Sequence, residues 1–272
     1  MKKKIVAIIL THNSEHIIKK TIKSAQKVTK NVVIVDSYSN DNTLKIVKLL
    51  NCKIIKKKFI NYSNQRNFII RKYNKLCDWQ LHLDADEILT QKLIKSINII
   101  LASEEKKHVY LIKRSVIFMK KKLFFGGSSN WHLRLFPSKT TLVENTTYDQ
   151  HFVSSKSKQY LSGDLNDFIS SNISKWIISH NNYSSSIAKV KYKNIKKTVN
   201  ANFFGNNIER LRFFKKMYLK FPSSFLKPII LFIYKYFFLL GFLDGKVGFY
   251  YCFFNSLWFR TLIEAKKYEN KL

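Results

Sequence analysis

Cysteine is scarce in this sequence, and so are acidic side chains and long uninterrupted apolar runs. The three cysteines, Cys52, Cys77 and Cys252, lie far apart, and no two of them form a C-x-x-C pair. This spacing excludes the common cysteine motifs of zinc and redox sites. It also gives no disulfide framework, which fits a protein of a reducing compartment.

The shortage of acidic residues leaves a large positive charge. There are 49 Lys and Arg against 17 Asp and Glu, a formal net charge of +32. Such a field favours phosphate-bearing partners, namely nucleic acid, anionic lipid or a nucleotide, although a bias towards Asn, Ile and Lys would also raise the charge. A basic recognition helix or an aromatic RNA-binding motif is lacking, so we expect no nucleic-acid partner.

Long apolar runs are missing at both ends. Lys2 to Lys4 precede only six apolar residues, too few for a signal peptide, so we expect a first strand here and catalytic machinery in the cytosol. The apolar run 225–242 is broken by Lys227, Pro228 and Lys235 and falls short of the roughly 20 residues of a spanning helix. Its aromatic and lysine content predicts a helix on an anionic membrane surface. The alternative is a C-terminal helix packed on the core.

What the chain does contain is enough apolar sequence for a sizeable core, since 46% of its 272 residues are hydrophobic. Apolar strand patterns alternate with amphipathic helix patterns through the first half. Strands are expected at 5–10, 32–35, 53–57 and 79–83, and helices at 17–25, 44–50 and 64–73. Asn13 or Ser14 is a candidate cap for the first helix. This alternation predicts a parallel sheet with helices on both faces.

The second half has a different pattern. After a helix at 93–101, strands are expected at 108–119, at 123–125 across a lysine turn at 120–122, and at 132–136. Residues 162–183 are predicted to be mostly helical, and from about 211 the composition shifts to Phe, Tyr, Leu and Lys. We therefore divide the chain into a domain at 1–210, with halves 1–103 and 104–210, and a helical segment at 211–272.

The chain is organised around the stretch 79–87, where an alternating strand ends in Asp84-Ala85-Asp86. Side chains two apart on extended backbone share a face, so both carboxylates point to one spot. Their repulsion is relieved by a cation, and oxygen ligands suit Mg²⁺ or Mn²⁺. The plain alternative is an acidic turn that caps the helix near Thr90.

Other polar residues follow the neighbouring strands. Thr11 to Asn13 follow the first strand and Asp36 ends the second. In open parallel sheets, ligands bind at the carboxyl ends of the strands. The sequence therefore predicts one site at this edge.

Together these residues resemble family 2 glycosyltransferases of the GT-A fold. The resemblance rests first on four ordered stretches: Ile8–Asn13, Val35–Thr43, Asn64–Asn67 and Leu83–Glu87. The second half is similar to glycosyltransferases of the lipopolysaccharide core and of polysaccharides. Its matching stretches are His132–Phe136, Asp149–Phe152, His180–Tyr183 and Gly241–Gly248. The implied fold is a Rossmann-like α/β sheet with a C-terminal, membrane-associating helical segment.

The resemblance also implies residue roles. Thr11, His12, Asn13 and Glu15 would line the nucleoside pocket, Asp36 would bind uracil or ribose, and Asp41 would order that loop. Asp84 and Asp86 would hold the ribose and a divalent cation, Mg²⁺ or Mn²⁺, that bridges the diphosphate. Arg66 would add a positive contact, or else lie on a helix surface.

For an inverting transfer, the resemblance implies a carboxylate general base. Asp149 is the candidate, although Tyr148 stands where many relatives carry an acid, and Glu144 is the alternative. His151 has three roles open to it: metal ligand, acceptor contact or structural residue. His180 is expected to be a packed histidine.

Three functions follow from different classes of protein. The leading hypothesis is an inverting, metal-dependent hexosyltransferase that uses a UDP-sugar and a lipid-linked glycan at the inner face of the cytoplasmic membrane. A nucleotidyl- or phospho-sugar transferase is less favoured because no glycine-rich phosphate loop follows the first strand. A basic nucleic-acid-binding protein has only the charge in its favour.

Overall fold

The fold was analysed in a computed structural model of the chain. The structure describes residues 4–103, 107–144, 151–170, 172–189 and 225–272, together with the single residues 202, 204, 213 and 217. These residues form two compact units. Unit 1 comprises residues 1–117 and 129–169, and unit 2 comprises residues 118–128 and 170–272. The division expected at 210/211 therefore differs from the observed one, which places the helix after residue 170 in unit 2.

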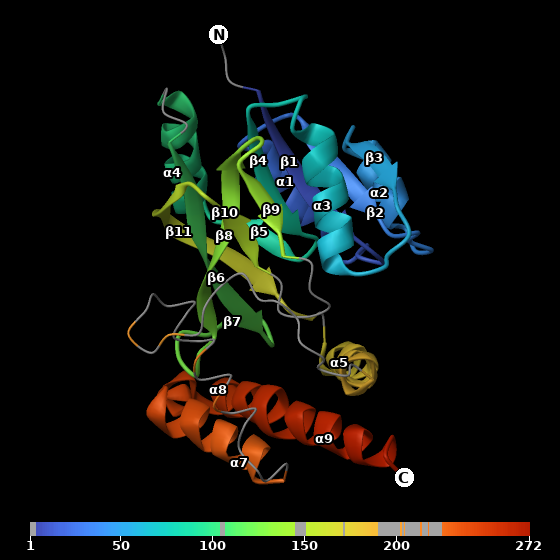
Figure 1. The fold of residues 1–272 in the computed structure, drawn as a ribbon, viewed down its shortest axis with the longest axis vertical. Coiled ribbons are helices and arrows are strands. Elements are labelled where there is room, and N and C mark those ends of the chain that lie inside the picture. The colour runs from blue at the N-terminus through green and yellow to red at the C-terminus, as the bar shows by residue number, and fades with distance from the viewer. Residues whose placement is uncertain are drawn as a thin grey trace. The chain divides into compact units, whose positions relative to one another are not determined.

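The first half of unit 1 alternates strands and helices as expected (Figure 1). Its elements are β1 (Ile5–Thr11), α1 (Ile18–Gln26), β2 (Val32–Asp36), α2 (Thr43–Leu49), β3 (Lys53–Lys56), α3 (Tyr62–Tyr73), β4 (Trp79–Asp84), β5 (Glu87–Leu89) and α4 (Gln91–Ala102). The strands β3, β2, β1 and β4 lie side by side and parallel. The predicted parallel arrangement is confirmed.

The second half of unit 1 extends this sheet. It contributes β6 (His108–Phe118), β8 (Ser129–Pro137), β9 (Thr141–Val143), β10 (Phe152–Ser154) and β11 (Ser157–Phe168). The strand order is β3-β2-β1-β4-β8-β6-β11-β5, and β8 runs antiparallel to both of its neighbours. The short strands β9 and β10 form a separate antiparallel pair.

Helices cover both faces of the sheet because the buried strands alternate their side chains between two cores. Ala7, Ile9 and Ile34 face one core, to which α1, α2 and α4 contribute Ile22, Val47 and Leu93. The alternate residues of β1 and β2 face the other core, where they meet α3: Val6, Ile8, Leu10, Val33, Val35, Ile69 and Tyr73. The predicted α/β fold class is confirmed at this level.

Three local predictions are wrong. Residues 162–168 belong to strand β11 (Ser157–Phe168) rather than to the predicted helix, which begins only at Ile173. Lys121 and Lys122 form the short strand β7 instead of a turn, while residues 123–125 are not a strand. The first helix begins at Ile18 with Ile17 at its N-cap position and no side-chain cap, so neither Asn13 nor Ser14 caps it, because a turn at 15–17 comes between.

Unit 2 is built from helices rich in aromatic residues (Figure 1). Its elements are β7, α5 (Ile173–Ala188), α7 (Leu226–Ile233), the π-helix η1 (Tyr234–Phe238), the 3₁₀-helix η2 (Gly241–Asp244), α8 (Gly245–Cys252), the π-helix η3 (Phe253–Trp258) and α9 (Phe259–Glu269). Trp176 on α5 is 2% exposed and contacts Phe254 and Trp258. The helix α5 is therefore tied to the C-terminal helices by a shared aromatic core.

None of the described helices alone has the length and apolar character to cross a bilayer. Taken as a pair, Leu226–Phe238 and Gly241–Glu269 do reach that length and composition, with a bend of 70° between them.

Candidate active site

The carboxyl ends of three adjacent strands bring the predicted site residues to one edge of the sheet. Thr11 is paired in register with Asp36 on one side of β1, and Leu10 is paired with Asp84 on the other. The polar ends of β2, β1 and β4 are thus neighbours. This is the edge at which parallel sheets bind ligands.

A network of hydrogen bonds joins the loops that follow β1 and β2. The Asp36 carboxylate, which is fully buried, accepts hydrogen bonds from the Ser39 N–H at 3.0 Å and the Ser39 hydroxyl at 2.5 Å. The Asn13 N–H donates to the Ser39 Oγ at 2.9 Å, and the Asn13 Oδ1 accepts the Asn40 N–H at 2.9 Å. The His12 Nδ1 donates to the Ser37 carbonyl at 3.0 Å. Two loops far apart in sequence therefore form one surface.

Asp41 and Glu15 extend this network. The Asp41 carboxylate accepts the N–H groups of Thr43 and Glu15, at 2.9 and 3.1 Å. Burial raises the pKa of Asp41, but these hydrogen bonds outweigh it and the net pKa is lowered. The Glu15 Oε2 in turn accepts two hydrogen bonds from Asn42. Asp41 thus links the loop after β1 to the loop after β2.

Asp84 lies between two arginines. Its Oδ1 is paired with the Arg66 guanidinium, and its Oδ2 with that of Arg134 at 2.8 Å. Both arginine side chains are buried, at 4% and 8% exposed. Burial raises the pKa of Asp84, but the two guanidinium groups outweigh it and hold the pKa well below its usual range. Asp84 is therefore a stable carboxylate whose two oxygens already have cationic partners.

Glu87 and His82 complete the surroundings of these arginines. The Glu87 carboxylate pairs with Arg134 at 2.5 Å and accepts the Asp84 N–H at 2.8 Å. The Arg66 Nη1 donates to the His82 Nδ1 at 3.3 Å, so His82 carries its proton on Nε2, which donates to Gln80. Burial and the two arginine charges push the pKa of His82 well below its ordinary value. His82 is thus a neutral imidazole that accepts a hydrogen bond from Arg66.

Asp86 differs from Asp84 in having no cationic partner. No ion pair or side-chain hydrogen bond of its carboxylate is found within the described part of the chain. Burial raises the pKa of Asp86 well above its ordinary value, and the negative charges of Asp167, Asp84 and Glu87 raise it further. Asp86 is therefore the carboxylate that most needs a cation.

Of these negative charges, that of Asp167 on β11 raises the pKa of Asp86 the most. Asp167 is 3% exposed and is held by the Arg114 guanidinium, whose Nε donates to its Oδ2 at 2.6 Å. The cluster as a whole contains the carboxylates of Asp84, Asp86, Glu87 and Asp167 against the guanidiniums of Arg66, Arg114 and Arg134. Asp86 is the one carboxylate of this cluster that forms an ion pair with none of these three guanidiniums.

The cluster fits a cation, but not the complete ligand set predicted. An unpartnered carboxylate with a second one nearby offers the hard oxygen ligands that Mg²⁺ and Mn²⁺ prefer. However, no group of three or more His, Cys, Asp or Glu side chains suited to a metal occurs in the described ranges. Such an ion would have to complete its shell from water or substrate oxygens, which is usual for Mg²⁺.

The remaining predicted residues lie elsewhere or outside the description. Asp149 and Tyr148 lie outside the described residues. Glu144 is 7% exposed, and its N–H donates to the His151 carbonyl at 3.0 Å, next to β10. Burial lowers the pKa of His132 well below its ordinary value, and the charges of Arg134, Arg114 and His151 lower it further. His180 is stacked on Trp176 with ring centres 3.5 Å apart, as expected for a packed histidine.

Four members of the cluster were missed by sequence reasoning: Glu87, Arg114, Arg134 and Asp167. The sequence could have pointed to Arg134, because it is a charged residue in the apolar strand predicted at 132–136. It gave no indication of Asp167, because the segment around Asp167 was predicted to be helical. The alternative that the acidic turn caps the helix near Thr90 does not hold, because Thr90 itself caps α4 by accepting the Leu93 N–H at 3.4 Å.

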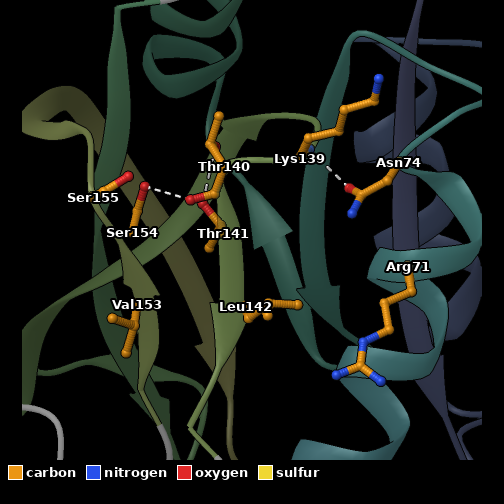
Figure 2. Close-up of a pocket in the computed structure, with 9 residues that line it drawn as sticks. All are labelled: Arg71, Asn74, Lys139, Thr140, Thr141, Leu142, Val153, Ser154 and Ser155. Atoms are coloured by element: carbon orange, nitrogen blue, oxygen red, sulfur yellow. Dashed lines mark hydrogen bonds between the residues drawn. The ribbon is translucent and has the colours of Figure 1, made fainter.

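A pocket of about 440 Å³ is lined by none of the residues of this cluster, and Figure 2 shows the residues that do line it. The C-terminal half of α3 and the chain around β9 and β10 line it, with Arg71 and Lys139 as its cations. Ser138, next to Lys139, bonds the backbone of Asp78 at the start of β4. The pocket therefore lies towards the amino end of β4, and none of the predicted site residues lines it.

Comparison with known proteins gives a consistent result. The family model described as Glycosyl transferase family 2 matches residues 6–162. An uncharacterised glycosyltransferase of Rickettsia typhi is 32% identical over 215 residues, which cover 73% of this chain and 71% of that protein. One of Rickettsia felis is 32% identical over 214 residues, covering 72% and 73%.

Solved structures share the fold at low sequence identity. A mannosyltransferase from Pyrobaculum calidifontis, in complex with GDP-Man and Mn²⁺, gives a TM-score of 0.52 at 10% identity. The match covers 100% of this chain and 89% of that protein. At this identity the likeness concerns the fold alone.

Proposed function

The chain belongs to glycosyl transferase family 2, and we propose that it is an inverting enzyme that moves a hexose from a UDP-sugar to a lipid-linked glycan. The glycan would be a lipopolysaccharide core or a surface polysaccharide. The observation that carries the proposal is the unpartnered Asp86 at the carboxyl end of β4, beside the ordered loops after β1 and β2. A nucleotide-sugar donor and a divalent cation are supported by the mannosyltransferase of the same fold, which was solved with GDP-Man and Mn²⁺.

The donor nucleoside would bind on the joined loops. Thr11, Asn13 and Glu15 come from one loop, and Asp36 and Asp41 from the other. Because hydrogen bonds already fix these loops to each other, little ordering would be needed when the donor binds. The choice of uracil rests on the resemblance of these stretches to UDP-sugar enzymes.

Asp86 and Asp167 would hold the divalent cation, with Asp84 beside them. The cation would neutralise charge on the leaving diphosphate, which is Lewis-acid chemistry. Asp84 would remain ionised between Arg66 and Arg134 and accept hydrogen bonds from the ribose through its half-exposed carboxylate. The arginines would keep Asp84 from competing for the same cation. His151 remains a candidate for a further ligand.

Asp149 is the proposed general base that takes the proton of the acceptor hydroxyl. Positioned bases contribute about 10²–10⁴-fold to such transfers. Glu144 is the alternative, and its buried position near β10 would require the acceptor to approach that strand pair. Asp149→Asn and Glu144→Gln, compared in turnover and in donor binding, separate the two assignments.

The helices of unit 2 would bind an anionic membrane surface and bring the enzyme to its lipid-linked acceptor. In support, α7 and η1 expose Ile230, Phe237 and Phe238, in a chain of net charge +32. Apolar side chains and lysines together are typical of helices that lie in the membrane interface. The enzyme would then work at the inner face of the cytoplasmic membrane.

A screen of nucleotide sugars tests the proposed function. We expect one UDP-sugar to be hydrolysed or transferred only with Mg²⁺ or Mn²⁺, and we expect Asp86→Asn and Asp167→Asn to lose this activity. Asp164→Asn is the matched control, because Asp164 also lies on β11 but is not one of the residues proposed to hold the cation. Full activity of Asp86→Asn in EDTA would refute the cation site, and turnover with GDP-sugars alone would refute the choice of UDP.

A further inference from the structure

Unit 2 contains a group of polar side chains that the transfer reaction does not use. Lys235 lies in the π-helix η1, while Asn255 and Ser256 lie in the π-helix η3. The Lys235 Nζ donates a hydrogen bond to the Asn255 Oδ1 at 2.9 Å. Arg260 follows Ser256 by four residues and thus shares its helix face. π-helical turns are rare and occur often at functional sites.

Neither cation of this group has a counterion among the described residues. Burial and, after it, the positive charge of Arg260 lower the pKa of Lys235 to about 8. No carboxylate of the described residues pairs with either cation. Asp244 accepts the Phe125 N–H at 2.9 Å, and Glu264 pairs with Lys267. Two partly buried cations that repel each other are stabilised when a ligand supplies the negative charge.

Two buried polar atoms of the group are also without a partner. Ser256 is fully buried, and its hydroxyl makes no hydrogen bond to any described residue. The Arg260 Nε is likewise buried and unpaired with respect to the described chain. Buried donors are nearly always satisfied in folded proteins, so each calls for an explanation. A bound anion that accepts from both would provide it.

The surroundings are aromatic and closely packed. The Lys235 Nζ lies 5.9 Å from the centre of the Tyr251 ring, and the Arg260 guanidinium lies 5.5 Å from that of Phe259. The loop 126–128 passes alongside, since a Cβ at Gly127 would lie 3.9 Å from the Lys235 Cε. In apolar surroundings a charge-assisted hydrogen bond is stronger than in water.

We propose that Lys235, Ser256 and Arg260 form a binding site for the terminal phosphate group of an amphiphile. An ammonium, a guanidinium and a hydroxyl together can satisfy three oxygens, which a phosphate has and a carboxylate does not. The apolar part would lie along η1, which exposes Phe237 and Phe238 next to Lys235. The site deepens the proposed function, on which it rests, because a lipid-linked acceptor carries such a phosphate.

The test measures the chemical reactivity of the Lys235 amine and does not depend on enzyme turnover. With a pKa of about 8, Lys235 should be acylated by an amine-reactive reagent at pH 8 far faster than exposed Lys246, as mass spectrometry would show. Phosphatidylcholine vesicles doped with phosphatidic acid, a phosphate monoester, should slow this acylation of the full-length protein. Vesicles doped with phosphatidylglycerol, a diester, at matched surface charge should slow it much less.

Variants then assign the effect to the cluster. Arg260→Gln should weaken binding to the phosphatidic acid vesicles by about tenfold or more and abolish their preference over phosphatidylglycerol. Ser256→Ala, a nearly isosteric change, should reduce the same preference and serves if Arg260→Gln does not fold. Lys246→Gln removes a charge from an exposed position on α8 and should weaken binding to both vesicles equally, with the preference intact.

The outcomes are distinguishable from those of the transfer assay. Protection of Lys235 by inorganic phosphate as strong as that by phosphatidic acid would support the anion site but assign it to free phosphate. Protection by neither, or an unchanged preference in both Arg260→Gln and Ser256→Ala, would overturn the site. Protection in a protein that transfers no sugar would leave the site standing and refute only the proposed function.

Discussion

Asp84 and Asp86 stand two residues apart at the end of β4, yet their electrostatic environments are opposite. Asp84 has a guanidinium on each oxygen, whereas Asp86 faces other carboxylates. The sequence placed both carboxylates correctly at the edge of the sheet, because strand periodicity is a local property. It could not reveal the arginines that distinguish them, because Arg66 and Arg134 arrive from α3 and β8 through tertiary contacts.

The first prediction concerns Asp86. Its folded pKa is raised, so the folded state binds more protons than the unfolded chain and loses stability as pH rises above about 4. In EDTA at pH 8, Asp86→Asn should therefore raise Tm by a few degrees while it abolishes activity. The gain should shrink towards pH 4. A lower Tm for this variant at pH 8 would contradict the description of Asp86 as an unpaired carboxylate.

Asp84→Asn, in contrast, should lower the stability of the protein. It leaves the buried guanidiniums of Arg66 and Arg134 with less compensating charge, which costs several kcal/mol in fully buried pairs. Because the Asp84 side chain is 37% exposed, we expect a smaller loss of roughly 1–3 kcal/mol in the free energy of unfolding. Urea denaturation at pH 7 measures this loss. Equal stability of the Asp84→Asn and wild-type proteins would mean that the two ion pairs contribute nothing.

At the scale of elements, the strands of the first half were predictable and β11 was not. Ile5 to Leu10 form an unbroken apolar run, which marks a strand buried on both faces whatever its partners. Around the end of β11, by contrast, Leu165, Phe168 and the following Ile169 happen to fall at helical spacing. The strand exists because it pairs along β6 and with β5, and such long-range pairing overrides local periodicity. The error concealed Asp167, and with it part of the candidate cation site.

Gly163 in β11 is a position where the backbone conformation and the close approach of α4 both require glycine. Its φ is +97°, and a Cβ there would lie 2.3 Å from the backbone nitrogen of Leu93 in α4. Gly163→Ala should therefore move α4 or the strand and cost roughly 1–3 kcal/mol beyond the backbone strain. Gly245→Ala is the control, because Gly245 has a φ of +66° but nothing within 4 Å of its Cβ. Equal Tm losses in both variants would show that strain, not close packing, governs Gly163.

At the scale of the whole molecule, composition indicated a basic α/β protein with an aromatic C-terminal region, but not the boundary between the two units. The expected boundary at 210/211 followed a shift in composition. The observed division at 169/170 follows contacts, since α5 shares the aromatic core of α9 through His180, Tyr183 and Phe259. Composition does not record which helix packs on which. A truncation before Phe225 would accordingly expose Trp176 and destroy unit 2, so it cannot test membrane binding.

The exposed apolar residues of unit 2 allow a cleaner test. Leu226, Ile230, Ile233 and Phe237 recur at spacings of three or four, so they share one helix face, and all of them are exposed. Phe225 and Phe238, at the two ends of this stripe, are each 73% exposed. Large side chains this exposed contribute little to the core. Their replacement should therefore leave unit 2 folded.

The double variant Phe225→Glu and Phe238→Glu should lose membrane binding. Each aromatic ring that enters the interface contributes roughly 1.5–3 kcal/mol, and each added acid is repelled by about 1 kcal/mol at an anionic surface. Cosedimentation with anionic vesicles should therefore fall at least about tenfold, while UDP-sugar hydrolysis in solution is unchanged. Ile99→Glu is the matched control, because Ile99 is 69% exposed on α4 of unit 1 and should not affect binding. Salt should release the wild-type protein only in part, since screening weakens the lysine contribution but not apolar insertion. Undiminished cosedimentation of the double variant, or complete release of the wild type by salt, would mean that charge alone holds the protein at the membrane.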